Sequence, residues 1–231
     1  MSIDFGGKQH RVLGVIPARG GSKRLPKKNI LEVAGISLVG RSVIEAEKVT
    51  AIDHVICSTD DTNIADEAVR YGADVPFMRP AELATDDATS IDMMLHVVAE
   101  MSDFDVVVLL QPTSPFRTHC HVTDALRLFA GSMADSCVSV CPSVDDNLPK
   151  YWLRNNHLKI ASHSMLTPDD AEFFSPNGAI YIASADLIKT KKSFYGVKCV
   201  PFFMSESESL DIDTPEDFEK FRRAAGSLDR Q

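Results

Sequence analysis

A cluster of basic residues follows the first apolar run of the chain. It holds five cations and no acid within ten residues, although the whole chain has a formal net charge of -9. A positive cluster that opposes the overall charge indicates a local anionic ligand. We expect Gly20 and Gly21 to let the backbone turn and bring its N–H groups close to phosphate oxygens, while the cations supply charge-assisted hydrogen bonds. The five cations are Arg19, Lys23, Arg24, Lys27 and Lys28.

This basic segment matches neither of two common phosphate-binding patterns. It contains no G-x-x-x-x-G-K-[ST] run and no G-x-G-x-x-G run. These absences exclude a Walker P-loop and a dinucleotide fingerprint. A solvated basic loop between a strand and a helix is the alternative. Paired glycines, two prolines and this charge density seldom occur together in a plain loop, so the pattern favours a polyphosphate site.

A second group of residues that could take part in chemistry is the acidic pair Asp211 and Asp213. In an extended segment, residues two apart lie on one face, so the pair would present two carboxylates together and turn Ile212 away. Like charges at that distance repel unless a cation lies between them, and Mg²⁺ typically binds one or two carboxylates with phosphate and water. On these residues alone, a turn and cap before the last helix explains the pair equally well.

A polar loop follows the most apolar run of the chain and reads LQPTSPFR over residues 110–117. Its two prolines restrict the backbone, and Gln111, Thr113, Ser114 and Arg117 offer polar groups suited to a polyhydroxylated sugar. A connection whose hydroxyls cap the following helix explains these residues equally well.

Alternating strands and helices must position these segments. Continuous apolar runs such as residues 106–110 are typical of a parallel sheet covered on both faces, and the order of elements predicts an α/β fold. Ligands bind such sheets at the carboxyl ends of the strands, where the basic cluster and the polar loop both begin. The expected strands are 12–16, 54–57, 105–110, 136–141, 179–183 and 197–204, and the expected helices are 38–49, 62–71, 90–101, 120–130 and one that starts at Pro215 after Thr214 as N-cap.

The alternation breaks between Pro142 and Ser175, where Asp, Asn, Pro and His are frequent. We interpret residues 142–195 as a small lobe inserted into a single domain that spans residues 1–231, because 231 residues with 44% hydrophobic content suit one substantial core. A flexible loop is the alternative for the first part of this segment.

Composition also limits the location and the partners. Five cysteines without a C-x-x-C pair predict reduced thiols and a cytoplasmic protein. The first residues lack the apolar core of a signal peptide, and no run approaches the ~18 apolar residues of a membrane span, so neither secretion nor a membrane partner is expected. The acidic composition, with a pI of about 5.2, argues against a nucleic-acid partner.

Five segments, in the same order along the chain, resemble blocks of the N-acylneuraminate cytidylyltransferases, the CMP-sialic acid synthetases. The resemblance implies a doubly wound, mostly parallel α/β sheet of the sugar-nucleotide transferase type with a small dimerisation lobe. It also implies transfer of CMP from CTP to a nine-carbon sugar acid with release of pyrophosphate, a Mg²⁺ cofactor and a homodimer. The segments are residues 15–29, 79–86, 110–117, 176–181 and 211–214.

The same resemblance implies roles for individual residues. Those expected to act in catalysis are Arg19, Lys23, Lys28 and Asp211, and those expected to bind the nucleotide are Ala18, Arg19, Gly20, Lys28, Asn29, Arg79 and Ser90. Those expected to bind the sugar are Gln111, Lys150, Asn177, Tyr181, Phe194 and Tyr195, and those expected to bind Mg²⁺ are Asp211 and Asp213. Plainer interpretations exist for several: Arg79 as a surface cation, Ser90 as a helix cap, Lys150 as a surface lysine and the aromatic pair as packing.

One departure from the family leaves the sugar open. Where the family often has an Arg-Gln pair, about ten residues before the Asn-Gly block, this chain reads TPDD over residues 167–170. An N-acylneuraminate is therefore the first expectation, and a legionaminic- or pseudaminic-type acid is the nearest alternative. Two further classes of protein fit some of the motifs: a metal-dependent glycosyltransferase and a non-catalytic nucleotide-binding regulator.

Overall fold

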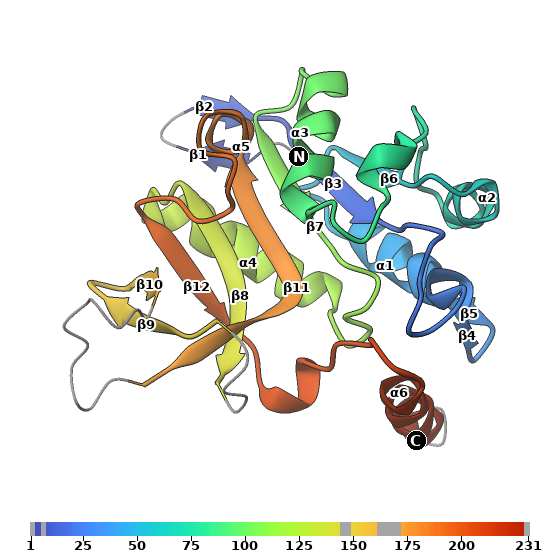
Figure 1. Ribbon diagram of the computed structural model, residues 1–231. Helices are drawn as coiled ribbons and strands as arrows, with labels where there is room; N and C mark the ends of the chain where they lie inside the picture. The colour runs from blue at the N-terminus through green and yellow to red at the C-terminus, as the bar shows by residue number, and fades with distance from the viewer. Residues whose placement is uncertain (1–2, 6–7, 144–148, 161–171, 229–231) are drawn as a thin grey trace.

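Strand β3 carries the basic cluster at its end and lies between two parallel neighbours in the main sheet (Figure 1). Five of the six central strands point the same way, and β11 alone is antiparallel to both of its neighbours in this group. The prediction of a mostly parallel α/β sheet is therefore confirmed. In spatial order the six strands are β6 (His54–Ser58), β3 (Val12–Pro17), β7 (Val106–Leu109), β11 (Phe174–Ser184), β8 (Ser136–Pro142) and β12 (Cys199–Phe203).

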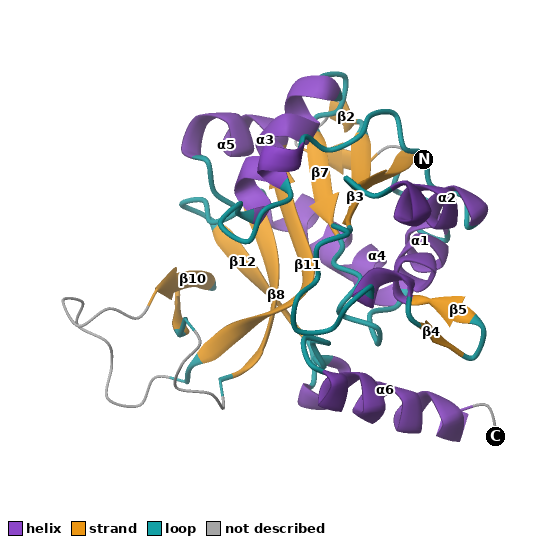
Figure 2. Ribbon diagram, turned by 45° about the vertical axis from the view of Figure 1, so that its right-hand side comes forward, coloured by secondary structure: helices purple, strands orange, loops and turns teal. Residues whose placement is uncertain are grey.

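The computed structural model describes residues 3–5, 8–143, 149–160 and 172–228. Helices cover both faces of the sheet (Figure 2). Because side chains alternate along a strand, β3 sends Val12 and Ile16 into one layer of the core and Leu13 and Val15 into the other. The first layer packs against α1 (Leu38–Glu47), α2 (Thr62–Arg70) and α4 (His119–Ser132), and the second against α3 (Ser90–Glu100) and α5 (Ala185–Lys191).

The last helix, α6 (Pro215–Leu228), begins as the sequence predicts. The Thr214 hydroxyl accepts a hydrogen bond from the Asp217 amide at 3.2 Å, and the Asp217 carboxylate accepts one from the Thr214 amide at 3.1 Å. These reciprocal bonds satisfy two amides at the start of the helix. The helix packs Phe221 with the fully buried Ile212, which anchors the acidic segment just before it.

The segment predicted as an inserted lobe contains both main-sheet and peripheral elements. Strand β11 starts at Phe174 and α5 covers the sheet, whereas β9 (Tyr151–Arg154) and β10 (His157–Ile160) form a hairpin that extends the sheet through pairing of Tyr151 with Phe174 (Figure 1). Its turn is Asn155-Asn156, with φ of 51° and 61°, a pair that favours tight hairpins. The boundaries and the dimerisation role of a lobe at 142–195 stay predictions, and residues 167–170 lie outside the described residues.

Smaller elements complete the fold. Two short hairpins flank the main sheet, and three 3₁₀ turns lie in loops. All five cysteines are free thiols, as expected; three are buried, Cys141 is half-buried and Cys120 is exposed. No helix within the described residues is both long and apolar enough to cross a membrane. The hairpins are β1 (Ile3–Phe5) with β2 (Lys8–His10) and β4 (Glu32–Val33) with β5 (Ile36–Ser37), and the turns are η1 (Lys28–Ile30), η2 (Ala81–Leu83) and η3 (Glu206–Glu208).

Candidate active site

A cavity of about 410 Å³ opens where β3 and β7 end, which is the edge of the sheet that the sequence predicts for a ligand. Its walls come from the basic cluster, the residues after β7, the segment before α3 and the acidic segment before α6. Elements far apart in the sequence therefore meet at one place. The predicted site residues that line this cavity are Arg19, Lys23, Lys28, Asn29, Arg79, Ser90, Gln111, Asp211 and Asp213.

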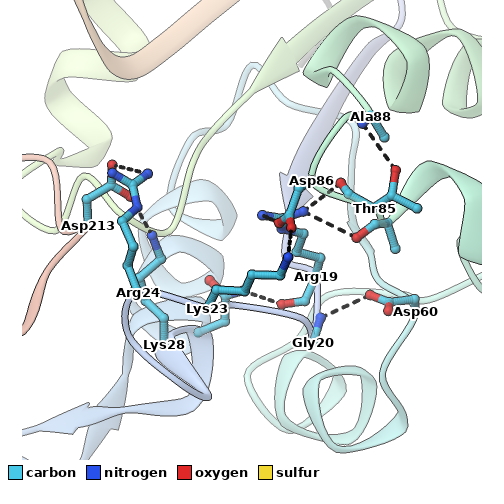
Figure 3. A network of polar contacts seen from close by, with 12 residues as sticks. Arg19, Gly20, Lys23, Arg24, Lys28, Asp60, Thr85, Asp86, Ala88 and Asp213 are labelled. Atoms are coloured by element: carbon cyan, nitrogen blue, oxygen red, sulfur yellow. Dashed lines mark hydrogen bonds and ion pairs between the residues drawn. The ribbon is translucent and has the colours of Figure 1, made fainter.

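The first pair of cations shares one carboxylate (Figure 3). Arg19 Nη2 lies 2.8 Å from one oxygen of Asp86, and Lys23 Nζ contacts the other oxygen. Arg19 also donates from Nη1 to the Thr85 carbonyl oxygen at 2.6 Å. The hydrogen bonds from Lys23 and Arg19 hold the pKa of Asp86 below its usual range. In this arrangement the Asp86 carboxylate stands where the two cations would meet an anionic ligand.

The second pair of cations shares Asp213 (Figure 3). Lys28 Nζ donates to Asp213 Oδ1 and to the Ile212 carbonyl oxygen, both at 2.9 Å, and Arg24 Nη2 lies 2.8 Å from Asp213 Oδ2. Lys28 is mostly buried, with 14% of its side chain exposed, whereas Arg24 is 71% exposed. Lys28 therefore has a fixed position beside the acidic pair, and Arg24 reaches it from the solvent side.

Of the two glycines in the basic cluster, Gly20 is required by close packing, and neither adopts a left-handed conformation. Neither Gly20 nor Gly21 has a positive φ; the residue in the left-handed region is Lys27, with φ of 56°. A Cβ on Gly20 would lie 2.7 Å from the Asp61 carboxylate, so a side chain does not fit there. The Gly20 amide donates to Asp60 Oδ1 at 3.0 Å. The chain still turns here, because the Ser22 amide donates to the Gly20 carbonyl oxygen at 3.0 Å across Gly21, so the predicted turn at the paired glycines forms without a left-handed residue.

Two other predicted nucleotide-binding residues, Ala18 and Asn29, are buried beneath the basic cluster. Ala18 is fully buried in the core. The Asn29 side chain is 5% exposed and donates from Nδ2 to the Arg19 carbonyl oxygen at 2.9 Å, which ties the two ends of the cluster together. Asn29 lines the cavity as well, and Ala18 does not.

Arg79 and Ser90 reach the cavity from the β6 side. Arg79 is 7% exposed and donates to the Ser58 hydroxyl at 3.2 Å and to the Ser58 carbonyl oxygen, so it is not the surface cation of the plainer interpretation. Burial lowers the pKa of the Arg79 guanidinium. Ser90 is the first residue of α3, and the cap is Thr89, whose hydroxyl accepts from the Asp92 amide. The interpretation of Ser90 as the cap is therefore wrong.

The acidic pair has the arrangement that alternation predicts. Asp211 and Asp213 both line the cavity, and Ile212 between them is fully buried. The segment is held by the Ile212 amide, which donates to the Thr113 carbonyl oxygen at 2.8 Å. Because the cap of α6 is made by Thr214 and its partner, neither carboxylate of the pair serves as that cap.

Burial and neighbouring groups shift the pKa of Asp211 in the acidic pair. Asp211 is open to the cavity yet ringed by protein atoms, and this burial raises its pKa; Asp213 raises it further, while a hydrogen bond from Thr113 opposes both. No group of three or more His, Cys, Asp or Glu side chains within the described ranges could hold a metal ion. A metal on this pair would need phosphate or water oxygens as its other ligands, which is the usual situation for Mg²⁺.

The polar loop after β7 divides between the cavity and the core. Gln111 and Thr113 line the cavity, as expected for part of the loop. Ser114 and Arg117 are 1% and 3% exposed. Arg117 donates to the Gln111 and Ala179 carbonyl oxygens at 2.7 and 3.1 Å, so it fixes the loop to β11 and cannot reach a ligand. The hypothesis that all four polar groups bind a sugar is wrong for these two buried residues.

The remaining predicted sugar-binding residues do not line the cavity in the described part of the chain. Asn177 is 6% exposed; its Oδ1 accepts from the Ser139 hydroxyl at 2.6 Å, and its Nδ2 donates to the Ser209 hydroxyl at 2.9 Å. Asn177 thereby ties β11 to the segment that leads to Asp211. Lys150 lies 5.9 Å from the ring centroid of Phe173.

The aromatic residues form a packed group beside the cavity. Tyr181 packs against Phe194 with ring centroids 5.2 Å apart, and Tyr195 stacks on Tyr151 at 5.0 Å with an interplanar angle of 11°. Burial raises the pKa of Tyr181, and the charge of Asp211 raises it further. The group therefore lies within electrostatic reach of the acidic pair, and its contact with a sugar stays a prediction.

The sequence reasoning missed the role of Asp86. Asp86 ends the block at residues 79–86, which was assigned to the nucleotide on the strength of Arg79. The available signal was the absence of any acid inside the basic cluster. Cations at that density need counter-ions from elsewhere in the chain, and an acid in a second block with the same expected ligand was the natural candidate.

Comparison with models of protein families matches residues 13–227 to a family described as Cytidylyltransferase. The chain belongs to the cytidylyltransferase family. The matched range contains every segment that lines the cavity. For this cytidylyltransferase, the interpretations as a glycosyltransferase or as a non-catalytic regulator are set aside.

Similar proteins include two curated relatives and a solved structure. The cytidylyltransferase is 38% identical to the CMP-N,N'-diacetyllegionaminic acid synthase of Legionella pneumophila, over 90% of this chain and 93% of that protein. It is 34% identical to the N-acylneuraminate cytidylyltransferase of Escherichia coli O18:K1:H7 over 90% of this chain, and the alignment covers 51% of that relative's length. A structure of CMP:2-keto-3-deoxy-manno-octonic acid synthetase complexed with CTP has a TM-score of 0.79 at 18% identity, covering 94% and 99% of the two chains, which shows the fold.

Proposed function

We propose that this cytidylyltransferase uses CTP to activate an N-acylated nine-carbon sugar acid, giving the CMP-sugar and pyrophosphate. The observation that carries the proposal is one cavity that joins a basic cluster to a pair of carboxylates. An N-acylneuraminate is the first candidate for the sugar. A diacetyllegionaminate is the second, favoured by the relative of nearly equal length that is named for that sugar.

In this proposal the anomeric hydroxyl gives up its proton to water and attacks the α-phosphorus of CTP in line. The bond between the α-phosphorus and the oxygen that bridges to the β-phosphorus breaks, and pyrophosphate leaves. Arg19, Lys23 and Lys28 would bind the triphosphate and stabilise the charge that develops on the leaving pyrophosphate. The three cations come from one short segment, and all three line the cavity. Each cation has a carboxylate partner in the free protein, so the triphosphate must compete for it.

We also propose that Asp211 and Asp213 hold Mg²⁺. The donor set fits, because two carboxylates face one cavity beside the cations that would hold phosphate oxygens. Bound Mg²⁺ neutralises charge on the phosphate oxygens. In the free protein, Lys28 donates to Asp213 and to the Ile212 carbonyl oxygen and so keeps this segment in place at the cavity.

The family resemblance also implies a homodimer, and we propose one here. Large apolar side chains are exposed on and near the β9–β10 hairpin: Ile160 is 53% exposed, Phe203 52% and Phe173 36%. The ring of Phe203 packs edge-on against Phe174 at 5.0 Å, which makes the patch continuous with the start of β11. Such a patch suits a second copy of the chain. Light scattering should give the mass of a dimer, and a monomer at the concentration of the assay would contradict this.

A substrate panel tests the function. Pyrophosphate release should be measured with CTP, UTP, ATP and GTP against N-acetylneuraminate, diacetyllegionaminate, pseudaminate and 3-deoxy-octulosonate, each with Mg²⁺ and with a chelator. We expect turnover with CTP, a nine-carbon acid and Mg²⁺ together, because a pocket that hydrogen-bonds particular groups rejects analogues that leave its donors unpaired. Release with a hexose 1-phosphate and with no nine-carbon acid would overturn the proposal.

A further inference from the structure

The contact between the basic cluster and the segment before α3 differs from an ordinary surface ion pair. Asp86 accepts from two cations at once: Arg19 at 2.8 Å on one oxygen and Lys23 on the other. Arg19 also donates from a second nitrogen to the carbonyl oxygens of Thr85 and Ala84, at 2.6 and 3.3 Å. Figure 3 shows the three side chains converging from opposite walls of the cavity. A carboxylate held by two converging cations occupies the position of a phosphate group.

Stability does not account for this arrangement. The side chains of Arg19, Lys23 and Asp86 are 33%, 80% and 42% exposed. Exposed ion pairs of this kind stabilise a fold little, because water screens the charges and two long side chains lose freedom. The contact therefore matters chiefly for what else the two cations can bind.

Asp86 is also unlike the acidic pair on the opposite wall. When a triphosphate is present, a divalent cation can lie between the phosphates and Asp211 and Asp213 and neutralise the charge of both carboxylates. Asp86 is neutralised only by cations that the triphosphate itself requires. With the nucleotide bound, the carboxylate and the phosphates would compete for Arg19 and Lys23, and their like charges would repel each other.

The segment that carries Asp86 is anchored by bonds that do not involve the Asp86 carboxylate. It lies between η2 and the start of α3, and Thr85 closes a local turn by accepting from the Ala88 amide at 3.2 Å. The capping box of α3 at Thr89 anchors the far end. Ala88, Thr89 and Ser90 line the cavity too, so most of this short segment borders the place proposed for the nucleotide.

We propose that Asp86 is a built-in counter-ion: it holds Arg19 and Lys23 in position in the free enzyme, yields them to the triphosphate of CTP, and recaptures them as pyrophosphate leaves. Asp86 acts through the two cations and is a positioning residue. It weakens the binding of both CTP and pyrophosphate, and it accelerates product release. This inference rests on the proposed use of CTP.

The test compares Asp86→Asn with Asp87→Asn. Asp87 is the adjacent acid, is exposed and does not line the cavity, so its variant removes the same charge from the same loop. Binding of CTP and of inorganic pyrophosphate is measured by calorimetry without any sugar. We expect Asp86→Asn to bind both ligands about threefold to tenfold more tightly, in the range of a lost surface charge contact. Asp87→Asn should stay within about twofold of the wild type, and Asp86→Glu should restore wild-type affinity.

Turnover separates this role from a structural one. Asp86→Asn should lower KM for CTP and strengthen inhibition by added pyrophosphate, with a melting temperature within about 2 °C of the wild type because the ion pair is exposed. Weaker CTP binding in Asp86→Asn, or equal effects of Asp86→Asn and Asp87→Asn, would overturn the counter-ion role alone. A wild-type protein that bound neither CTP nor pyrophosphate would overturn the proposed function together with it.

Discussion

The two sides of the cavity hold their polar residues in opposite ways. On the phosphate side, which we define as the segment from Arg19 to Asn29, Arg19, Lys23 and Arg24 line the cavity and pair with carboxylates that a ligand can replace. On the β11 side, defined by Asn177, Ser209 and Tyr181, polar groups are bound to each other or packed within the protein. The first side is built to exchange partners. The second is built to hold the segment that carries Asp211 in place.

This difference predicts that substitutions on the phosphate side change rate, whereas those on the β11 side change stability. The largest effect is expected for Lys28→Gln. Lys28 is fixed by two hydrogen bonds at 2.9 Å beside the acidic pair, and losing a positioned donor to a developing anion costs about 10² to 10³ in rate. Turnover should be measured by pyrophosphate release, with the melting temperature as the check on folding.

Lys27→Gln is the matched control for Lys28→Gln. It removes the same charge one residue away, at an exposed position that does not line the cavity. Gln can keep the left-handed backbone of Lys27 at no more strain than lysine, since both carry an unbranched Cβ. If the two variants lost activity equally, the cluster would act through its overall charge rather than through the position of Lys28.

The phosphate side was predictable because its information is local. The five cations are adjacent in sequence, and the strand before them places them at an edge where ligands bind. Two details were less accessible: the left-handed residue of the segment is Lys27 rather than a glycine, and Gly20 is required by its close approach to Asp61. Which acids neutralise the cations depends on contacts 67 residues apart, such as Arg19 with Asp86, and periodicity carries no such information.

The β11 side was less predictable for a related reason. The sequence indicates a strand at 179–183, but β11 begins at Phe174 because it also pairs with β8 and β9, and its register shifts between Pro176 and Tyr181. A shift of register changes which side chains face the core. The motif therefore could not predict which way the Asn177 side chain points. The alternation of residues did predict that Asp211 and Asp213 share one face.

The second prediction sharpens the comparison on the β11 side. Asn177→Ala should lower the free energy of unfolding by about 1–3 kcal/mol, because it removes the acceptor of the buried Ala179 amide and the bonds from Asn177 to the Ser139 and Ser209 hydroxyls. Affinity for CTP should change little. Chemical denaturation and calorimetry measure the two quantities. Ser207→Ala, at an exposed hydroxyl in the same segment, is the control that should leave both unchanged.

A large loss of sugar affinity in a stable Asn177→Ala protein would reverse this assignment. It would place Asn177 in direct contact with the sugar, as the family resemblance implies, and would require β11 to open toward the cavity when the sugar binds. The phosphate side and the β11 side would then no longer differ in the way described, because Asn177 would bind a ligand rather than only hold the protein together.

The smallest effect on stability is expected for a substitution of Glu208, which lies where the segment before Asp211 contacts α4. Glu208 accepts from the Ser205 amide at 3.1 Å and the Ser205 hydroxyl at 2.6 Å, and its other oxygen lies 3.3 Å from His121 Nε2. These bonds from Ser205 lower the pKa of Glu208 from its ordinary 4.5. A lowered pKa in the folded state means that the carboxylate stabilises the fold above pH 4.5, and that this contribution is lost as the pH falls through the lowered pKa.

Glu208→Gln should therefore destabilise the protein at pH 7 by less than about 1 kcal/mol, because the 42% exposed carboxylate is screened by water. The difference from the wild type should shrink as the pH falls through the lowered pKa of Glu208, because the wild-type side chain is then protonated and neutral like glutamine. It should also shrink in high salt, to the extent that the contact with His121 contributes. Denaturation at several pH values measures this. A loss as large as that of Asn177→Ala would mean that the segment depends on this exposed tether, and that the buried bonds of the β11 side are not what holds Asp211 in place.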